Sequence, residues 1–180
     1  MQRLLGKDFL AGLVPAGRCE LGQAFAAPFA VRMTGRVLGL SLDDVSRIDG
    51  FYTAFAGAMV YDGNPEPQRL ADAARDELNV VLHGELARCR RAPDDSLTSR
   101  VGNDAGVNLS DDELVAQMRV SMFGGIETIQ AAIMNTLLLL LRAPPQLDAV
   151  RANSALLPNA IEESLRLIPP VAFVERWTAR

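Results

Sequence analysis

Hydrophobic and polar residues alternate along most of this chain with the period of an α-helix. The longest such pattern covers residues 110–142. It begins with Ser-Asp-Asp-Glu, a capping box in which the serine and the glutamate each satisfy a backbone amide of the other. It ends at Ala-Pro-Pro, because proline lacks an amide donor and disfavours the helical conformation before it. Since its second half is apolar on every side, we expect a central helix whose second half is buried all round.

The same period predicts further helices on both sides of the central one. They cover residues 2–14, 28–38, 41–60 and 69–91, a short segment ending near 101, and residues 146–152 and 158–167. Glycine and asparagine at 102–106 predict a turn that could close a small hairpin. Only residues 171–180 combine β-branched and aromatic side chains without a helical period. The sequence therefore predicts a mainly α fold built around one long central helix, with a short C-terminal β-strand.

Composition and charge exclude several kinds of partner. The net charge is −4, and the only basic cluster is residues 88–91, so we expect no nucleic-acid partner. The two cysteines, seventy positions apart, fit neither a metal site nor a disulfide framework and suit a reducing compartment. The apolar run 137–141 is far shorter than the roughly 20 residues that span a bilayer. Lys7 and Asp8 interrupt any signal sequence. We therefore expect a cytoplasmic protein with no membrane partner.

The middle of the central helix departs from the pattern of the rest. Gly124 and Gly125 each cost a helix about 1 kcal/mol relative to alanine. Glu127 places a carboxylate among isoleucines, and Thr128 can bond back to the carbonyl of Gly124 and bend the helix. Two interpretations stay open from these residues. They form a functional bend, or they form a helix crossing in which glycine allows close approach and Glu127 pairs with an arginine.

Together with later motifs, this segment resembles a known family. Gly-Gly-Ile-Glu-Thr at 124–128 matches the Ala/Gly-Gly-x-Asp/Glu-Thr pattern in the oxygen-activating helix of the cytochrome P-450 family, the heme-thiolate monooxygenases. Glu163 and Arg166 match its Glu-x-x-Arg helix. Arg176 stands where the family has an arginine that contacts a heme propionate. The motifs follow one another in the order of the family.

Upstream residues extend the resemblance to the soluble bacterial members. Residues 25–29 and 38–44 are similar to the segment that precedes the distal lid in those proteins. Ala30 and Ser41 depart from the family, which usually has proline at both positions.

One family motif has no counterpart. The cysteine that ligates the heme iron lies in a Phe-x-x-Gly-x-x-x-Cys-x-Gly loop after the Glu-x-x-Arg helix, and neither Cys19 nor Cys89 stands in that context. A central helix of about 50 Å would also protrude from a compact 180-residue body roughly 40 Å across. We therefore expect residues 1–180 to be one partial domain, an internal or truncated piece of a cytochrome P-450 fold.

The resemblance implies roles for the residues that match. Glu127 and Thr128 would be catalytic, with Thr128 hydrogen-bonding dioxygen and Glu127 relaying protons. Gly124 and Gly125 would leave room above heme, and Arg176 would bind a propionate. The cofactor would be heme, with no iron ligand from this chain.

Structural and substrate roles also follow from the resemblance. Glu163 and Arg166 would form a buried scaffold pair in the complete protein, although the residues alone equally fit a surface ion pair. Substrate would contact residues 59–67, the helix face at Met118, Ser121 and Met122, and residues 171–173. These regions are mostly apolar, which suits a small lipophilic substrate. The redox partner would be a ferredoxin or a flavin-type protein.

The sequence thus predicts a fragment of a monooxygenase, inactive alone, which in the complete protein hydroxylates a small lipophilic substrate. The alternative is a heme-free helical remnant or partner-binding scaffold without catalysis, which the missing cysteine loop favours. An unrelated helical ligand-sensing domain would not explain the ordered motifs.

Overall fold

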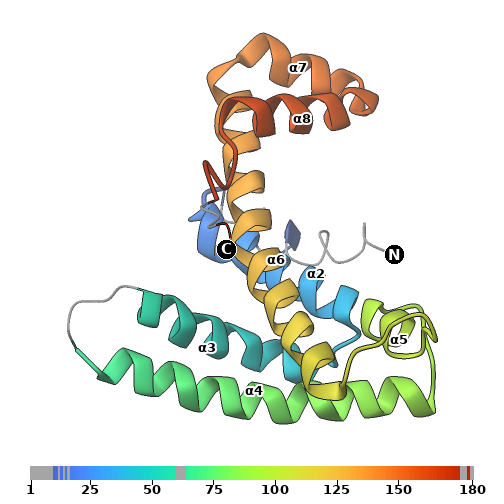
Figure 1. Ribbon diagram of the computed structural model, residues 1–180. Helices are drawn as coiled ribbons and strands as arrows, with labels where there is room; N and C mark the ends of the chain where they lie inside the picture. Colours follow the sequence, from blue (N-terminus) through green and yellow to red (C-terminus); the bar gives the residue numbers. More distant parts are fainter. Residues whose placement is uncertain are drawn as a thin grey trace. The chain divides into compact units, whose positions relative to one another are not determined.

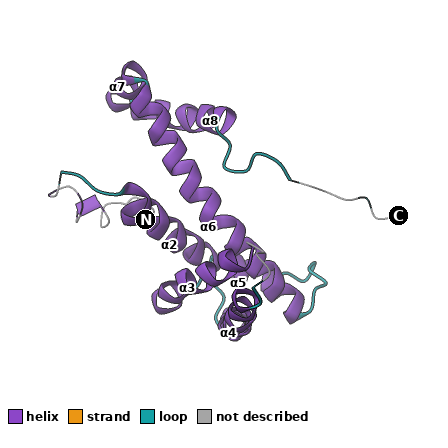
Figure 2. Ribbon diagram, turned by 90° about the vertical axis from the view of Figure 1, so that its left-hand side faces the viewer, coloured by secondary structure: helices purple, strands orange, loops and turns teal. Residues whose placement is uncertain are grey.

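The structure is a computed structural model that describes residues 10, 11, 13, 15, 17–59, 64–174 and 178. Nearly all of the regular structure is helical, and no described residue lies in a β-strand (Figure 2). The helical elements are η2 (Gly22–Ala26, a π-helix), α2 (Ala27–Leu38), α3 (Leu42–Met59), α4 (Glu66–Arg91), α5 (Leu97–Gly102), α6 (Asp111–Arg142), α7 (Pro144–Ala152), η3 (Ser154–Leu156, a 3₁₀-helix) and α8 (Leu157–Leu167). The predicted mainly α fold is confirmed.

The chain divides into two compact units. Unit 1 comprises the residues up to Ala30 and from Ile126 onward, and unit 2 comprises Val31–Gly125. The central helix α6 contributes its first half to unit 2 and its second half to unit 1. The single partial domain over residues 1–180 stays a prediction.

Unit 2 is built on an α-helical hairpin. Helix α3 packs along α4, and α5 packs on the C-terminal end of α4 (Figure 1). Leu78, Leu82 and Leu86 of α4 recur every four residues and are buried, as the helical period predicts, whereas Leu70 is 49% exposed. The largest fully buried side chains of the unit are Leu38, Ile48, Leu78, Leu82, Val115 and Met122.

Helix α2 ends at Gly39, whose φ of 85° suits glycine far better than other residues. The Leu40 amide donates to the Gly35 carbonyl at 2.9 Å and closes the turn. A Cβ at Gly39 would also lie 2.7 Å from Ser96 Oγ, so both conformation and space require glycine here.

The predicted capping box at the start of α6 is confirmed. Glu113 Oε2 accepts from the Ser110 amide at 2.8 Å, and Ser110 Oγ accepts from the Glu113 amide at 3.3 Å. The first turn of α6 is also tied to α4. Arg90 pairs with Asp111 at 2.7 Å, and His83 Nε2 lies 3.1 Å from Asp112 Oδ1. The lone histidine therefore helps to fasten the helix start.

The prediction that the second half of α6 is buried all round is wrong for this chain. Leu140 is buried, but Leu138 is 40% and Leu141 64% exposed. An all-apolar helix loses its water contact only where neighbours cover every side, and these residues are left uncovered. Within the described residues, α6 is the one helix long and apolar enough to cross a membrane, with a mean hydropathy of 1.4 over an 18-residue stretch. The core helix of a soluble protein can have the same length and composition.

Unit 1 contains α7, η3 and α8 beside the second half of α6. The Asn135 side chain donates to the Ile168 carbonyl at 3.0 Å and ties α6 to the end of α8. Residues 171–174 have no regular structure, and 175–177, 179 and 180 lie outside the described residues, so the C-terminal strand is not confirmed. A strand needs a neighbour for its hydrogen bonds, and the described residues offer none. Gly102 ends α5, and residues 103–106 form turns without a hairpin.

Candidate active site

The segment at residues 124–128 lies entirely within α6. Neither glycine has a positive φ, so both adopt the ordinary helical conformation. Their cost to the helix is therefore one of propensity and not of backbone strain. The reason for two adjacent glycines must lie in what surrounds them.

The two glycines have different surroundings. A Cβ at Gly125 would lie 3.0 Å from Thr34 Oγ1 and 3.1 Å from Thr34 Cγ2, closer than side chains normally pack. A Cβ at Gly124 would meet nothing within 4 Å. Gly125 thus allows the close approach of α2, while Gly124 borders open space. The contact at Gly125 fits a helix crossing, and the functional bend stays a prediction.

The acid and the alcohol that follow lie on different sides of the helix. Glu127 is exposed and makes no ion pair with any side chain that the structure describes. The expected setting among isoleucines is wrong for this chain, because Ile126 is buried and the next residue is turned about 100° around the helix axis. Thr128 is half-buried. It stands four residues after Gly124, and so the two share one face of α6.

This face fits the distal side of a flat macrocycle. Gly124 leaves space, and the Thr128 hydroxyl lies one turn further along the same face. The proximal ligand is a different matter. Cys89 is fully buried and its thiol donates to Glu85 Oε1 at 3.3 Å, while burial raises the pKa of the thiol. Cys19 is exposed and stands outside the ligand motif. The residues present therefore fit one side of heme and supply no thiolate to the other.

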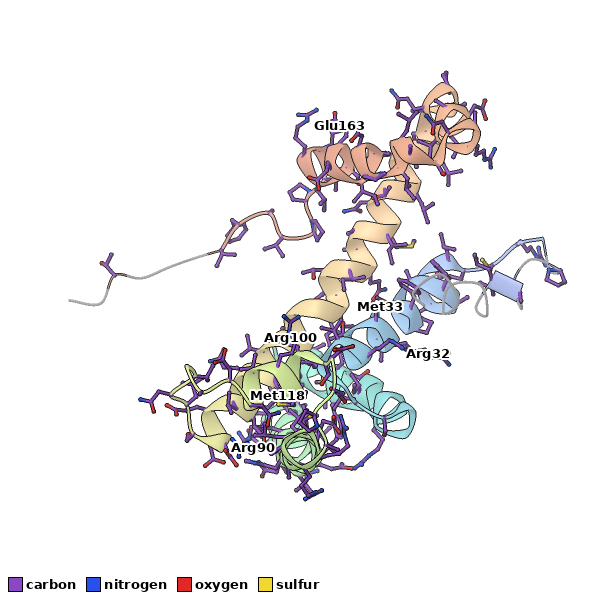
Figure 3. The ribbon with its side chains drawn as sticks, turned by 90° about the vertical axis from the view of Figure 1, so that its right-hand side faces the viewer. Arg32, Met33, Arg90, Arg100, Met118 and Glu163 are labelled. Carbon is purple, nitrogen blue, oxygen red and sulfur yellow. The ribbon has the colours of Figure 1, made fainter. Side chains whose placement is uncertain are left out.

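The pair at Glu163 and Arg166 forms as its spacing predicts. The guanidinium binds the carboxylate through two hydrogen bonds of 2.7 and 2.8 Å. These bonds lower the pKa of Glu163 and raise that of Arg166. Both side chains are more than half exposed in this chain, and Glu163 projects from α8 (Figure 3). The burial of the pair in a complete protein stays a prediction.

Beside this pair lies a groove of about 440 Å³ between α6, α7 and α8. It is lined by leucines and alanines and by the buried residues Thr136 and Ser164. Ser164 Oγ has no hydrogen-bond partner among the described residues. The groove belongs to unit 1 alone.

The predicted substrate regions have separate outcomes. Met122 is 1% exposed and is a core residue of unit 2, so it offers no surface to a substrate here. Met118 lies in the interior of the same unit (Figure 3) and, with Ser121, lines a pocket of about 110 Å³. That volume is below the roughly 300 Å³ of ordinary ligand pockets. Val171 and Phe173 are exposed. Arg176 and residues 60–63 lie outside the described residues.

One residue beside the segment was not anticipated from the sequence. Thr34 lies against Gly125, although 91 positions separate them, and a buried threonine in an amphipathic helix carries no distinguishing signal.

The π-helix η2 was not predicted from the sequence either. Pro28 reads as a helix start, but helical structure begins earlier. It widens just before the proline, which cannot donate to a carbonyl of the preceding turn.

Comparisons with known proteins identify the family. The family model for cytochrome P-450 matches residues 75–180, more than half of the chain. The vitamin D(3) 25-hydroxylase of Pseudonocardia autotrophica is 33% identical over 179 residues, covering 97% of this chain and 43% of that protein. The 6-deoxyerythronolide B hydroxylase of Saccharopolyspora erythraea is 30% identical over 167 residues, covering 91% and 40%.

Solved structures agree with the sequence relatives. The ligand-free structure of the cytochrome P-450 TbtJ1 superimposes with a TM-score of 0.81 at 30% identity, and CalO2 with 0.80 at 28%. Each covers 92% of this chain, which in turn covers 44% and 43% of theirs. The chain spans about two fifths of the length of the curated relatives it matches. It belongs to the cytochrome P-450 family, of which it represents a part of the fold.

Proposed function

We propose that the complete protein is a heme-thiolate monooxygenase and that this chain supplies the distal, oxygen-activating part of its active site. Heme, when bound, supplies the electron-transfer and dioxygen chemistry, and the protein supplies orientation and protons. The observation that carries the proposal is the open space beside Gly124 on the helix face that also bears Thr128. Membership of the family supports the same assignment.

The residues of α6 have separate tasks in this proposal. Gly124 leaves room for the macrocycle and a small ligand, and Gly125 keeps α6 close to α2. The exposed Glu127 carboxylate accepts a proton from solvent and passes it toward the neighbouring Thr128 hydroxyl. Thr128 Oγ1 takes up that proton as it donates its own hydroxyl proton toward the open face, so the hydroxyl stays neutral. Arg176 would bind a heme propionate through two parallel hydrogen bonds.

The remaining assignments concern the whole protein. The Glu163–Arg166 pair would serve as scaffold when the rest of the fold covers it. The substrate would be a small lipophilic molecule, in line with the hydroxylases among the relatives. Electrons would come from a ferredoxin or a flavin-type partner. The bacterial relatives support a cytoplasmic location.

Replacing Thr128 in the complete protein tests this function. Thr128→Ala removes the hydroxyl that transfers the proton, so reducing equivalents should be consumed but should emerge as hydrogen peroxide in place of hydroxylated product. The measurement is product formed per reduced cofactor oxidised, with peroxide assayed in parallel. We expect the product formed per cofactor oxidised to fall at least tenfold, since a positioned proton donor typically contributes roughly 10²–10⁴-fold.

Two further variants sharpen the test. Glu127→Gln cannot relay a proton and should slow turnover with a solvent isotope effect. Thr136→Ala changes another threonine of the same helix, whose hydroxyl donates to the Ala132 carbonyl at 2.8 Å, and it should leave the product ratio unchanged. If Thr128→Ala stays fully coupled with an accepted substrate, the proton-delivery role is wrong.

A second function is favoured by the cysteines. Because Cys89 is buried and bonded to Glu85 and Cys19 lies outside the ligand motif, the chain by itself suits a heme-free helical scaffold that packs on a partner. Restoring the missing parts of the family fold separates the two functions. The scaffold reading holds only if the completed protein still binds no heme.

A further inference from the structure

Thr34 is a buried residue of α2 that lies directly against the glycine step of α6. Its side chain is 6% exposed, and both of its outer atoms lie within 3.1 Å of the position that a Cβ at Gly125 would occupy. Any larger residue at position 125 would force Thr34 or α6 to shift, since packed interiors leave no spare room. The threonine therefore fills the space that the glycine leaves.

Thr34 and Gly125 contact each other by close packing and not through a hydrogen bond. Thr34 Oγ1 has no hydrogen-bond partner among the residues that the structure describes, whereas buried polar atoms nearly always have one. No hydrogen bond therefore holds the side chain in place, and its packing against Gly125 fixes it. Both residues belong to unit 2, so the contact lies within one compact body.

The contact decides which way α6 is turned. Successive residues of a helix are about 100° apart, so a one-residue rotation would present Gly124 to Thr34 and turn another side outward. With Gly125 against Thr34, the neighbouring Gly124 faces open space, and Thr128 follows on the same face as Gly124. The contact of Gly125 with Thr34 thus determines that Gly124 faces open space.

We propose that Thr34 is a positioning residue that, through Gly125, fixes the rotational setting of the oxygen-activating helix. The functional half of this inference rests on the proposed function, whereas the Thr34–Gly125 coupling does not. If the coupling is found but Thr128→Ala stays coupled to product formation, the proposed function fails and the contact stands.

The chain offers a matched pair of variants for the first test, which is made on the full 180-residue chain. Gly125→Ala should lower Tm by roughly 3–10 °C, the range expected of overpacking in a body of this size. Gly124→Ala, the same change one residue away, should raise it by roughly 2–4 °C, because alanine is the better helix former. Thr34→Ala combined with Gly125→Ala should recover most of the loss, since the clashing atoms are removed. Additive effects of the two changes would overturn the inference.

A second measurement separates positioning from general packing and does not depend on Gly125→Ala folding. Thr34→Ala should speed amide hydrogen exchange several-fold at residues 122–126, with little change along α3. Thr34→Val keeps the shape and removes the unpartnered hydroxyl, so it should exchange like the unaltered chain. Uniformly faster exchange, or a valine variant that behaves like the alanine variant, would contradict a role in positioning.

The complete, heme-loaded protein gives a third readout that packing alone would not move. The carbon–oxygen stretching band of its carbon monoxide complex should shift in Thr34→Ala, since α6 turns relative to the ligand. It should stay in place in Thr34→Val. A band that does not move in Thr34→Ala would show that Thr34 fills the core without positioning α6.

Discussion

The buried Glu85 carboxylate of unit 2 is hydrogen-bonded by side chains of its own helix. Glu85 is 7% exposed and accepts hydrogen bonds of 2.6–3.0 Å from Arg88. Arg88 also donates to Asp94 at 2.6 Å, which ties α4 to the loop before α5. Asp94 Oδ1 accepts from the Ser96 amide, and Ser96 in turn caps α5. The hydrogen bonds from Arg88 offset part of the free energy that it costs to bury the Glu85 carboxylate. Removing Arg88 would leave that cost uncompensated and would destabilise the fold.

The pKa of Asp94 makes the network sensitive to acid. Hydrogen bonds from Ser96 and Arg88 lower this pKa to about 2, below the roughly 3.9 of an unfolded aspartate. A lowered folded-state pKa contributes stability that is fully present above the unfolded value and is lost as pH falls through the folded value. Asp94→Asn should therefore lower Tm at pH 7, and the difference from the unaltered chain should shrink between pH 4 and pH 2. Thermal unfolding of both chains across this range checks the sign.

The adjacent Asp95 is the natural control. It is exposed, so Asp95→Asn should leave Tm nearly unchanged at every pH. A pH-independent difference between Asp94→Asn and the unaltered chain would mean that the Arg88 contact does not stabilise this fold through charge.

At the scale of elements, α6 depends on how it begins. The reciprocal bonds between Ser110 and Glu113 satisfy amides that no helical carbonyl can reach. They add to the ties from α4 at Asp111 and Asp112.

Ser110→Ala should accordingly destabilise the chain by about 1 kcal/mol, the usual cost of losing an N-cap. Amides in the first turn of α6 should also exchange faster. Ser121→Ala is the same substitution at an exposed position inside the helix, where alanine is the better helix former, and it should be neutral or slightly stabilising. Equal effects of the two changes would show that the cap contributes nothing.

The helices could be predicted because their signals are local. The capping box, the double proline after Arg142 and the four-residue spacing of leucines in α4 each depend on neighbours in the sequence, and the structure places the elements accordingly. What could not be predicted depends on distant residues. Whether Leu141 is covered, whether a partner strand exists for residues 171–174, and which glycine meets α2 are decided by long-range packing.

The candidate site shows the same division. Family motifs indicated Gly124, Gly125, Glu127 and Thr128 together, without distinguishing their tasks. Only the position of Thr34 distinguishes Gly125, which packs against it, from Gly124, which borders open space.

At the scale of the whole molecule, the chain is a part of a larger fold. It covers about two fifths of its relatives, and apolar side chains such as Leu141 and Phe173 are 64% and 78% exposed.

The surroundings of the two thiols predict that the isolated chain does not bind heme through a thiolate. Neither cysteine offers an accessible thiolate in the ligand motif, so adding heme, reductant and carbon monoxide should give no red-shifted band typical of thiolate ligation. The absorption spectrum checks this. A band that appears, and that Cys19→Ser or Cys89→Ser abolishes, would show that one of these thiols binds iron after all.

The contrast between the two thiols has a practical consequence. A buried thiol reacts with a labelling reagent only during the moments when its surroundings open, whereas an exposed one reacts at the intrinsic rate. The labelling rate of Cys19 therefore serves as an internal reference. The ratio of the Cys89 rate to the Cys19 rate reports how often the interior of unit 2 opens. The chain thus carries its own reporter of local opening, readable by mass spectrometry without any added probe site.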